Sequence, residues 1–79
     1  MDLNNVVDTV DYGKIVITLD KTLEKAGVSK FKLAKLTNLD YRVISRLTDE
    51  NRVNVDLDTL ARICYVLKCD LPELMHYEI

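Results

Sequence analysis

The chain has 79 residues, which is enough for one small domain. Hydrophobic residues make up 48% of it and charged residues 30%, a balance typical of a folded globular protein. No apolar run approaches the roughly 18 residues that a membrane span needs. The first eleven residues contain three Asp and no Lys or Arg, which is unlike a secretory signal. We therefore expect a cytoplasmic protein that does not enter a membrane.

Charge is distributed unevenly along the chain, although the net charge is only −2. Residues 1–14 carry three acidic side chains and one basic one. Residues 15–46 carry seven basic and three acidic side chains, and residues 47–79 carry three basic and seven acidic ones. A polyanion responds to the local field of a protein rather than to its total charge. The basic middle segment is therefore the candidate surface for nucleic acid.

The two ends of the chain are predicted to lie outside the helical body. Residues 1–13 are polar and acidic, and we expect a loose arm there, ahead of a single domain at 14–79. Residues 14–18 are rich in β-branched side chains, which favours a short strand. The apolar-alternating tail at 75–79 is its expected antiparallel partner. The two segments would form a small ribbon that joins the termini.

Between these ends the pattern predicts five short helices, and therefore an all-α domain with at most that ribbon added. Gly27 and Asn38 are expected to end the first two helices, because both tolerate a left-handed backbone. Pro72 suits the first turn of the last helix, and Glu73 is placed to complete a capping box there. The expected N-terminal caps are Thr18, Ser29, Asp40, Asp56 and Asp70. The residues expected to face the core are Leu19, Leu23, Ala26, Leu33, Ala34, Thr37, Val43, Ile44, Leu47, Leu57, Leu60, Ala61, Cys64 and Leu67.

Residues 30–50 have the pattern that two helices crossing through a short turn require. Ala34 is small at the point where the second helix would cross the first. Asn38 permits positive φ in the turn, and Leu39 supplies an apolar plug beneath it. The second helix would then be anchored inward by two apolar residues three positions apart, Ile44 and Leu47.

Residues 29–47 resemble the helix-turn-helix motif of the Xre/Cro-type regulators of bacteria and phage, nearly position for position. Residues 57–74 are similar to the fourth and fifth helices of that family, and the resemblance covers about 18–77. It implies a lambda-repressor-like domain that binds double-stranded DNA, as a homodimer on an inverted-repeat operator. The chain departs from the family at Asn38, where members usually have Gly, and at Lys30, where many have Gln.

The helix at about 41–48 would lie in the major groove with its N-terminal residues at base edges. Arg can bind guanine with two hydrogen bonds, and Lys can meet phosphates. The residues predicted to read bases are Tyr41, Arg42, Ser45 and Arg46, and those predicted to contact phosphates are Ser29, Lys30, Lys32 and Arg52. An ordinary solvated face would show similar charges. Phe31 is expected to pack rather than to enter DNA.

Other classes of function have little support in the sequence. One His, two Cys five residues apart and the lack of a Gly-rich loop offer no catalytic or metal-binding pattern. We therefore expect no enzyme, no metal and no cofactor, with Cys64 a reduced thiol in the core. The prediction is a sequence-specific DNA-binding transcriptional regulator, a repressor. The alternative is a helical protein-interaction module that works through its acidic flanks and does not bind DNA.

Overall fold

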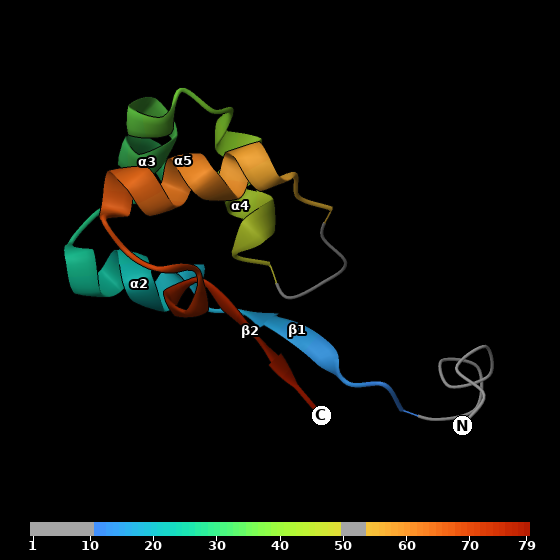
Figure 1. The fold of residues 1–79 in the computed structure, drawn as a ribbon. Coiled ribbons are helices and arrows are strands. Elements are labelled where there is room, and N and C mark those ends of the chain that lie inside the picture. The colour runs from blue at the N-terminus through green and yellow to red at the C-terminus, as the bar shows by residue number, and fades with distance from the viewer. Residues whose placement is uncertain (1–10, 50–53) are drawn as a thin grey trace.

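Four α-helices and a two-stranded antiparallel sheet make up the residues that the computed structural model describes, 11–49 and 54–79 (Figure 1). Residues 1–10 of the predicted arm lie outside these ranges. No helix within the described ranges is both long enough and apolar enough to cross a membrane. The elements are, in chain order, β1 (Lys14–Ile17), α2 (Leu19–Ala26), α3 (Lys30–Thr37), α4 (Tyr41–Leu47), α5 (Leu57–Leu67), the 3-10 turn η2 (Leu71–Glu73) and β2 (Met75–Glu78).

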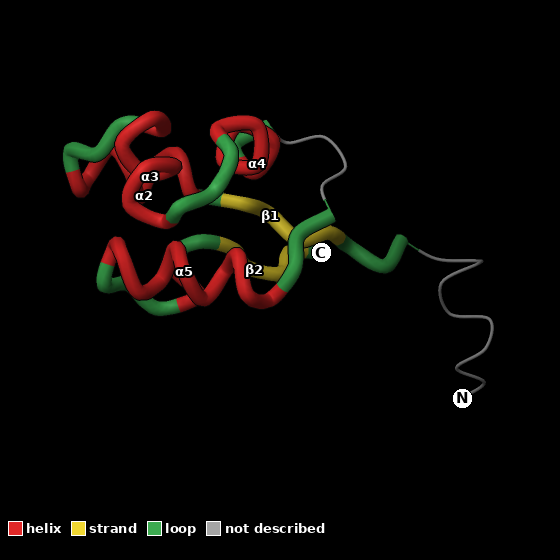
Figure 2. Tube along the Cα trace, turned by 90° about the horizontal axis from the view of Figure 1, so that it is seen from above, coloured by secondary structure: helices red, strands yellow, loops and turns green. Residues whose placement is uncertain are grey.

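The predicted ribbon is confirmed. Strands β1 and β2 pair antiparallel, with Ile15 opposite Tyr77 and Ile17 opposite Met75. Both figures show the two strands side by side, running out from the helices (Figures 1 and 2). The inner ends of the strands, Ile17 and Met75, meet residues of the helical core. At the outer end the Tyr77 hydroxyl donates to the Tyr12 carbonyl oxygen at 2.5 Å, which holds the chain just before β1.

The last of the five predicted helices forms only as a 3-10 turn, so the domain is mostly helical, with four α-helices and a small sheet in the described residues. Only the single 3-10 turn η2 forms at this point. Pro72 occupies that turn as expected, and the Asp70 N–H donates to Glu73 Oε2 at 3.0 Å. The turn cannot lengthen, because the chain must be extended from Met75 onward to pair with β1.

The core lies where the four α-helices and the end of η2 meet. Its six most buried large side chains are Leu19, Leu33, Ile44, Leu47, Ile63 and Leu74. Burying each of them stabilises the fold by about 2 kcal/mol. The predicted inner faces of α3 and α4 are confirmed by the burial of Leu33, Ala34, Thr37, Ile44 and Leu47, with Val43 half-buried.

The predicted inner face of α5 is partly wrong. Leu60 is buried as expected, and Leu67 and Cys64 are half-buried against the core. Leu57 and Ala61 are exposed instead, and Thr59 and Ile63 take their place inside. Ala26 of α2 was also expected inside and is exposed. Nearly every turn of α5 offers apolar side chains on more than one face, so packing against α3 decides which face is buried.

Helix starts are mostly fixed by the predicted caps. The side chains of Ser29, Asp40 and Asp56 each accept a hydrogen bond from a backbone N–H in the first turn of the helix that follows. Thr18 occupies the predicted N-cap position of α2, but its side chain makes no cap bond. The Thr18 hydroxyl donates instead to the Glu73 carbonyl oxygen at 3.0 Å, and its N–H donates to that of Leu74 at 2.7 Å. These bonds tie the start of α2 to η2.

Three helices end in the same way, with one left-handed residue followed by a half-buried apolar one. The left-handed residues are Gly27, Asn38 and Lys68, at φ 66°, 57° and 52°. After each, the next N–H bonds to the carbonyl five residues earlier, which for α3 joins Leu39 to Ala34 at 3.0 Å. These bonds and the buried residue that follows make a Schellman motif. The turn predicted at Asn38 is therefore confirmed.

Candidate nucleic-acid interface

Helices α3 and α4 form a helix-turn-helix whose turn is fixed by backbone geometry. Asn38 adopts φ 57° and ψ 40°, and its N–H and that of Leu39 satisfy the last carbonyls of α3. Leu39 then points its half-buried side chain at the core. The side chain of Asp40 begins α4 only two residues after the left-handed residue, by accepting from the Arg42 N–H at 2.8 Å. The reversal is therefore as short as the sequence predicted.

Helix α5 supports the α3–α4 pair through its contacts with α3. It packs against α3, and its Arg62 Nη1 donates to the Thr37 carbonyl oxygen at 3.2 Å. The last carbonyls of a helix lack partners inside it and carry partial negative charge, so a guanidinium there is favourable. Arg62 is itself oriented by Asp58 one turn earlier, with Nε 2.9 Å from Oδ2. The sequence analysis missed this link.

Helix α4 is two-sided. Ile44 and Leu47 are buried on its inner side. At the helical spacing of 100° per residue, the four predicted base-reading residues share the opposite half. Arg42 and Arg46 are exposed there, and Tyr41 and Ser45 are half-buried. The structure thus exposes the two arginines to a ligand, whereas Tyr41 packs partly against the core and Ser45 is partly covered.

Arg42 is paired with Asp40 in this structure. Arg42 Nη2 lies 3.2 Å from Asp40 Oδ2, and the two side chains are 82% and 51% exposed. The hydrogen bond from the Arg42 side chain, with its backbone N–H, lowers the pKa of Asp40, to which Arg46 adds a smaller electrostatic contribution. The same contact raises the pKa of Arg42. Arg46 makes no ion pair among the residues that the structure describes.

The predicted phosphate-contacting residues lie mostly at the start of α3. Ser29 is exposed, and its hydroxyl oxygen accepts from the Lys32 N–H at 3.1 Å. Lys32 is exposed, and Lys30 is half-buried. The fourth residue, Arg52, lies outside the described residues. Both lysines belong to the first turn of a helix, where exposed N–H groups also favour an anion.

Phe31 was expected to pack inside the protein, but the structure leaves it exposed. It is 70% exposed, and its ring stacks on that of Tyr41 with centroids 4.2 Å apart and planes 12° apart. The stack joins the first turn of α3 to the first residue of α4. The sequence gives no local signal for it, because the two residues are ten positions apart and meet only through the helix-turn-helix turn.

These features together describe a helix-turn-helix with a basic outer surface. Residues 18–78 match the Cro/C1-type HTH DNA-binding domain. The chain belongs to that family. This confirms the resemblance predicted from residues 18–77. Members of the family bind DNA and are typically not enzymes. A search among curated proteins finds no relative that matches the chain.

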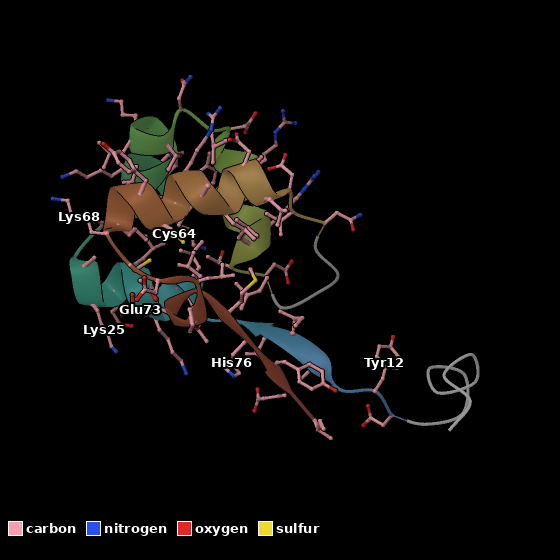
Figure 3. All side chains as sticks on the ribbon, in the orientation of Figure 1. Tyr12, Lys25, Cys64, Lys68, Glu73 and His76 are labelled. Atoms are coloured by element: carbon pink, nitrogen blue, oxygen red, sulfur yellow. The ribbon has the colours of Figure 1, made fainter. Side chains whose placement is uncertain are left out.

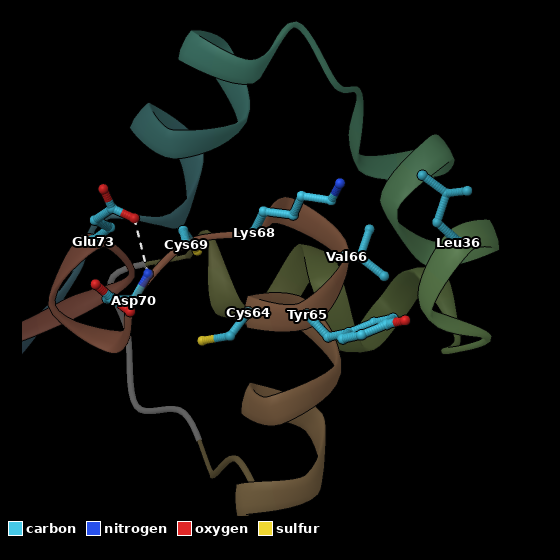
Figure 4. Close-up of a pocket in the computed structure, with 8 residues that line it drawn as sticks. All are labelled: Leu36, Cys64, Tyr65, Val66, Lys68, Cys69, Asp70 and Glu73. Atoms are coloured by element: carbon cyan, nitrogen blue, oxygen red, sulfur yellow. Dashed lines mark hydrogen bonds between the residues drawn. The ribbon is translucent and has the colours of Figure 1, made fainter.

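The two cysteines of this Cro/C1-type domain lie together at the end of α5 (Figure 4). The Cys69 N–H donates to the Cys64 carbonyl oxygen at 3.1 Å, which places both residues in the Schellman motif around Lys68. Burial, and then the neighbouring Cys64, raise the pKa of Cys69 to about 11. A thiol with this pKa stays protonated near neutral pH and is therefore a weak nucleophile. Within the described ranges, no cluster of three or more potential ligands could hold a metal ion.

Proposed function

We propose that this Cro/C1-type domain is a sequence-specific transcriptional regulator that reads the major groove with α4. One observation carries the proposal: the outward face of α4 presents Arg42 and Arg46 opposite its buried Ile44 and Leu47. An α-helix fits the major groove of B-DNA, and an arginine there can bind guanine O6 and N7 together. Each such pair contributes about 1–3 kcal/mol of discrimination against a wrong base.

The proposed base-contacting and phosphate-contacting residues lie on different helices. Tyr41, Arg42, Ser45 and Arg46 face the bases from α4, as the geometry of the family implies. Ser29, Lys30 and Lys32 lie at the start of α3, from which they would meet the sugar–phosphate backbone on one side of the groove. Arg52 would add a phosphate contact from the segment between α4 and α5. Phosphate contacts set the register of the protein on DNA, and base contacts set its sequence preference.

We further propose that the domain binds as a two-fold dimer on an inverted repeat. The seven residues of α4 rise about 10 Å, which spans roughly three base pairs of DNA. Three base pairs recur far too often in a genome to define an operator, so a second copy is needed to read a second half-site. Both copies must meet the same face of the duplex. Half-site centres should therefore lie about one helical turn apart, roughly 34 Å.

Repression is the simplest outcome of such binding. An occupied operator excludes other proteins from the same DNA, and this requires no surface beyond those that bind DNA and the second copy. Activation would require a second surface that recruits a partner.

Selection of bound duplexes from a random pool tests the proposal directly. We expect enrichment of an inverted repeat that contains a guanine in each half-site. The variant with Arg42→Ala and Arg46→Ala is the matched control, because both side chains are exposed and the fold should survive their loss. It should enrich no such repeat. If the unaltered protein enriches no sequence, although it is folded, the protein-interaction module becomes the better description.

A further inference from the structure

The stacked pair of Phe31 and Tyr41 is an apolar feature on the basic face of the helix-turn-helix. Phe31 is 70% exposed although it has a large ring, whereas the leucine two positions later is fully buried. Tyr41 covers only one side of that ring. The outer side of the phenyl ring is therefore left in water at the junction between α3 and α4.

The surroundings of Phe31 combine apolar surface with two cations, which suits a nucleic acid better than a purely apolar protein surface. Phe31 lines an open hollow with Ser29, Lys32, Lys35 and Leu36. Two of these five side chains are cationic. Tyr41, on which Phe31 rests, is the first residue of α4, and the first residues of a recognition helix are the ones that meet base edges. Phe31 therefore lies between residues suited to phosphates and residues suited to bases.

We propose that Phe31, supported by Tyr41, contacts the 5-methyl group of one thymine in each half-site. This contact rests on the function proposed above. A phenyl ring has no hydrogen-bond donor or acceptor, and pressing it against a phosphate or a polar base edge would desolvate that group without compensation. The thymine methyl is the one apolar group that standard base pairs present in the major groove. The contact adds Phe31 to the residues that determine sequence preference.

Substitution of single thymines by deoxyuridine tests the contact, because it removes one methyl group and leaves the hydrogen-bonding edges unchanged. The probe is the duplex selected by the unaltered protein, with each thymine replaced in turn. At one position in each half-site we expect deoxyuridine to weaken binding about 3- to 5-fold, the effect of losing one buried methyl group. Cytosine and 5-methylcytosine at that position should differ by a similar factor in favour of the methylated base.

Two variants of Phe31 and one control assign the effect to this ring. Phe31→Ala and Phe31→Gln should bind the thymine and deoxyuridine duplexes equally well. Tyr65→Ala should keep the full preference for thymine, because Tyr65 is an exposed aromatic residue of α5 outside the helix-turn-helix. Thermal melts should show all three variants folded, since each changes an exposed side chain.

The possible failures are distinguishable. If the unaltered protein enriches a sequence but binds it equally well with deoxyuridine at every position, the contact is wrong and the proposed function stands. If the preference for thymine persists undiminished in both Phe31 variants, another residue reads the methyl group. If no sequence is enriched at all, the proposed function fails and the contact fails with it.

Discussion

Asp40 and Arg42 hold each other at the first turn of α4, with Arg42 Nη2 3.2 Å from Asp40 Oδ2 and Nε 3.4 Å from Oδ1. The same carboxylate caps the helix by accepting from the Arg42 N–H at 2.8 Å. Asp40 thus begins α4 while engaging one of its two arginines. In the proposed complex a guanine would compete with Asp40 for the Arg42 guanidinium, and the carboxylate would also repel phosphates.

Asp40→Asn should tighten binding to the selected duplex by roughly 2- to 5-fold at low salt. Asn is as good a helix cap as Asp, so α4 should still form. The exposed ion pair contributes little to stability, whereas its loss frees Arg42 for DNA. Asp70→Asn, at the start of η2, is the charge-matched control and should leave the affinity unchanged. Equal tightening in both variants would show that only the net charge matters.

Acid should destabilise the fold through two capping carboxylates. Hydrogen bonds from the Arg42 side chain lower the pKa of Asp40, and those from Thr59 lower the pKa of Asp56, each from the ordinary 3.8. A carboxyl group whose pKa is lower in the folded state than in the unfolded state stabilises the folded state fully at pH values above its unfolded-state pKa. That contribution is lost as the pH falls through the folded pKa. The free energy of unfolding should therefore decline below about pH 4.

Urea unfolding between about pH 5 and pH 2.5 measures this decline. Asp56→Asn keeps a capping oxygen but removes the titrating group, so its stability should fall less steeply with pH than that of the unaltered protein. Parallel curves for the two proteins would show that the Asp56 cap has no part in acid unfolding.

The effect of a Gly substitution on stability should differ between the left-handed positions 68 and 38, because Lys and Asn tolerate positive φ to different degrees. Lys68 has a φ of 52° without the side-chain chemistry that suits Asn to this region, so Lys68→Gly should stabilise the fold by about 0.5–1 kcal/mol. Asn38→Gly should be near neutral. Asn38→Val should destabilise the fold by about 1–2 kcal/mol, because a β-branched residue is strained there. Thermal melts check the order, and a stabilising Asn38→Val would place the turn elsewhere.

Alanine substitutions at two glycines with positive φ, Gly27 and Gly13, distinguish the cost of backbone strain from the cost of steric crowding. Gly27, at φ 66°, has open space where a Cβ would lie, so Gly27→Ala should cost about 1–2 kcal/mol of strain alone. At Gly13, with φ 80°, a Cβ would collide with the carbonyl oxygen of Glu78 in β2. Gly13→Ala should therefore also open the ribbon and speed amide exchange at Ile15 and Val16. Unchanged exchange there in Gly13→Ala would contradict the observed register.

Local signals in the sequence are sufficient for the frame of the helix-turn-helix. Ser29 and Asp40 cap helices because each has a short side chain whose oxygen can accept a hydrogen bond from a backbone N–H of the first helical turn. Asn38 adopts positive φ because it lies where the apolar period breaks, and few other residues tolerate that conformation. The same reasoning misses Lys68, which ends α5 in the same way with an unsuited residue, because its neighbours in the Schellman motif impose the conformation.

Contacts between elements are what the sequence could not supply. The burial of Ile63 rather than Ala61 depends on how α5 lies against α3, since the periodicity of α5 permits either face. The Phe31–Tyr41 stack likewise exists only because the turn brings the starts of α3 and α4 together. The pairing of Asp40 with Arg42 was open to prediction, because an acidic cap two residues before an arginine places opposite charges in one helical turn.

Titration of the selected duplex at several salt concentrations tests the central claim, that α4 reads bases while the start of α3 contacts phosphates. Arg42→Ala or Arg46→Ala should weaken the selected site by about 1–3 kcal/mol and relax the base preference at one position in each half-site. Lys30→Ala should weaken selected and random duplexes alike and reduce the salt slope by about one. Lys25→Ala serves as the control, since Lys25 belongs to α2, outside the helix-turn-helix, and lies near Lys68 and Glu73 (Figure 3). If both arginine variants keep the affinity and the preference of the unaltered protein, α4 is not the recognition helix.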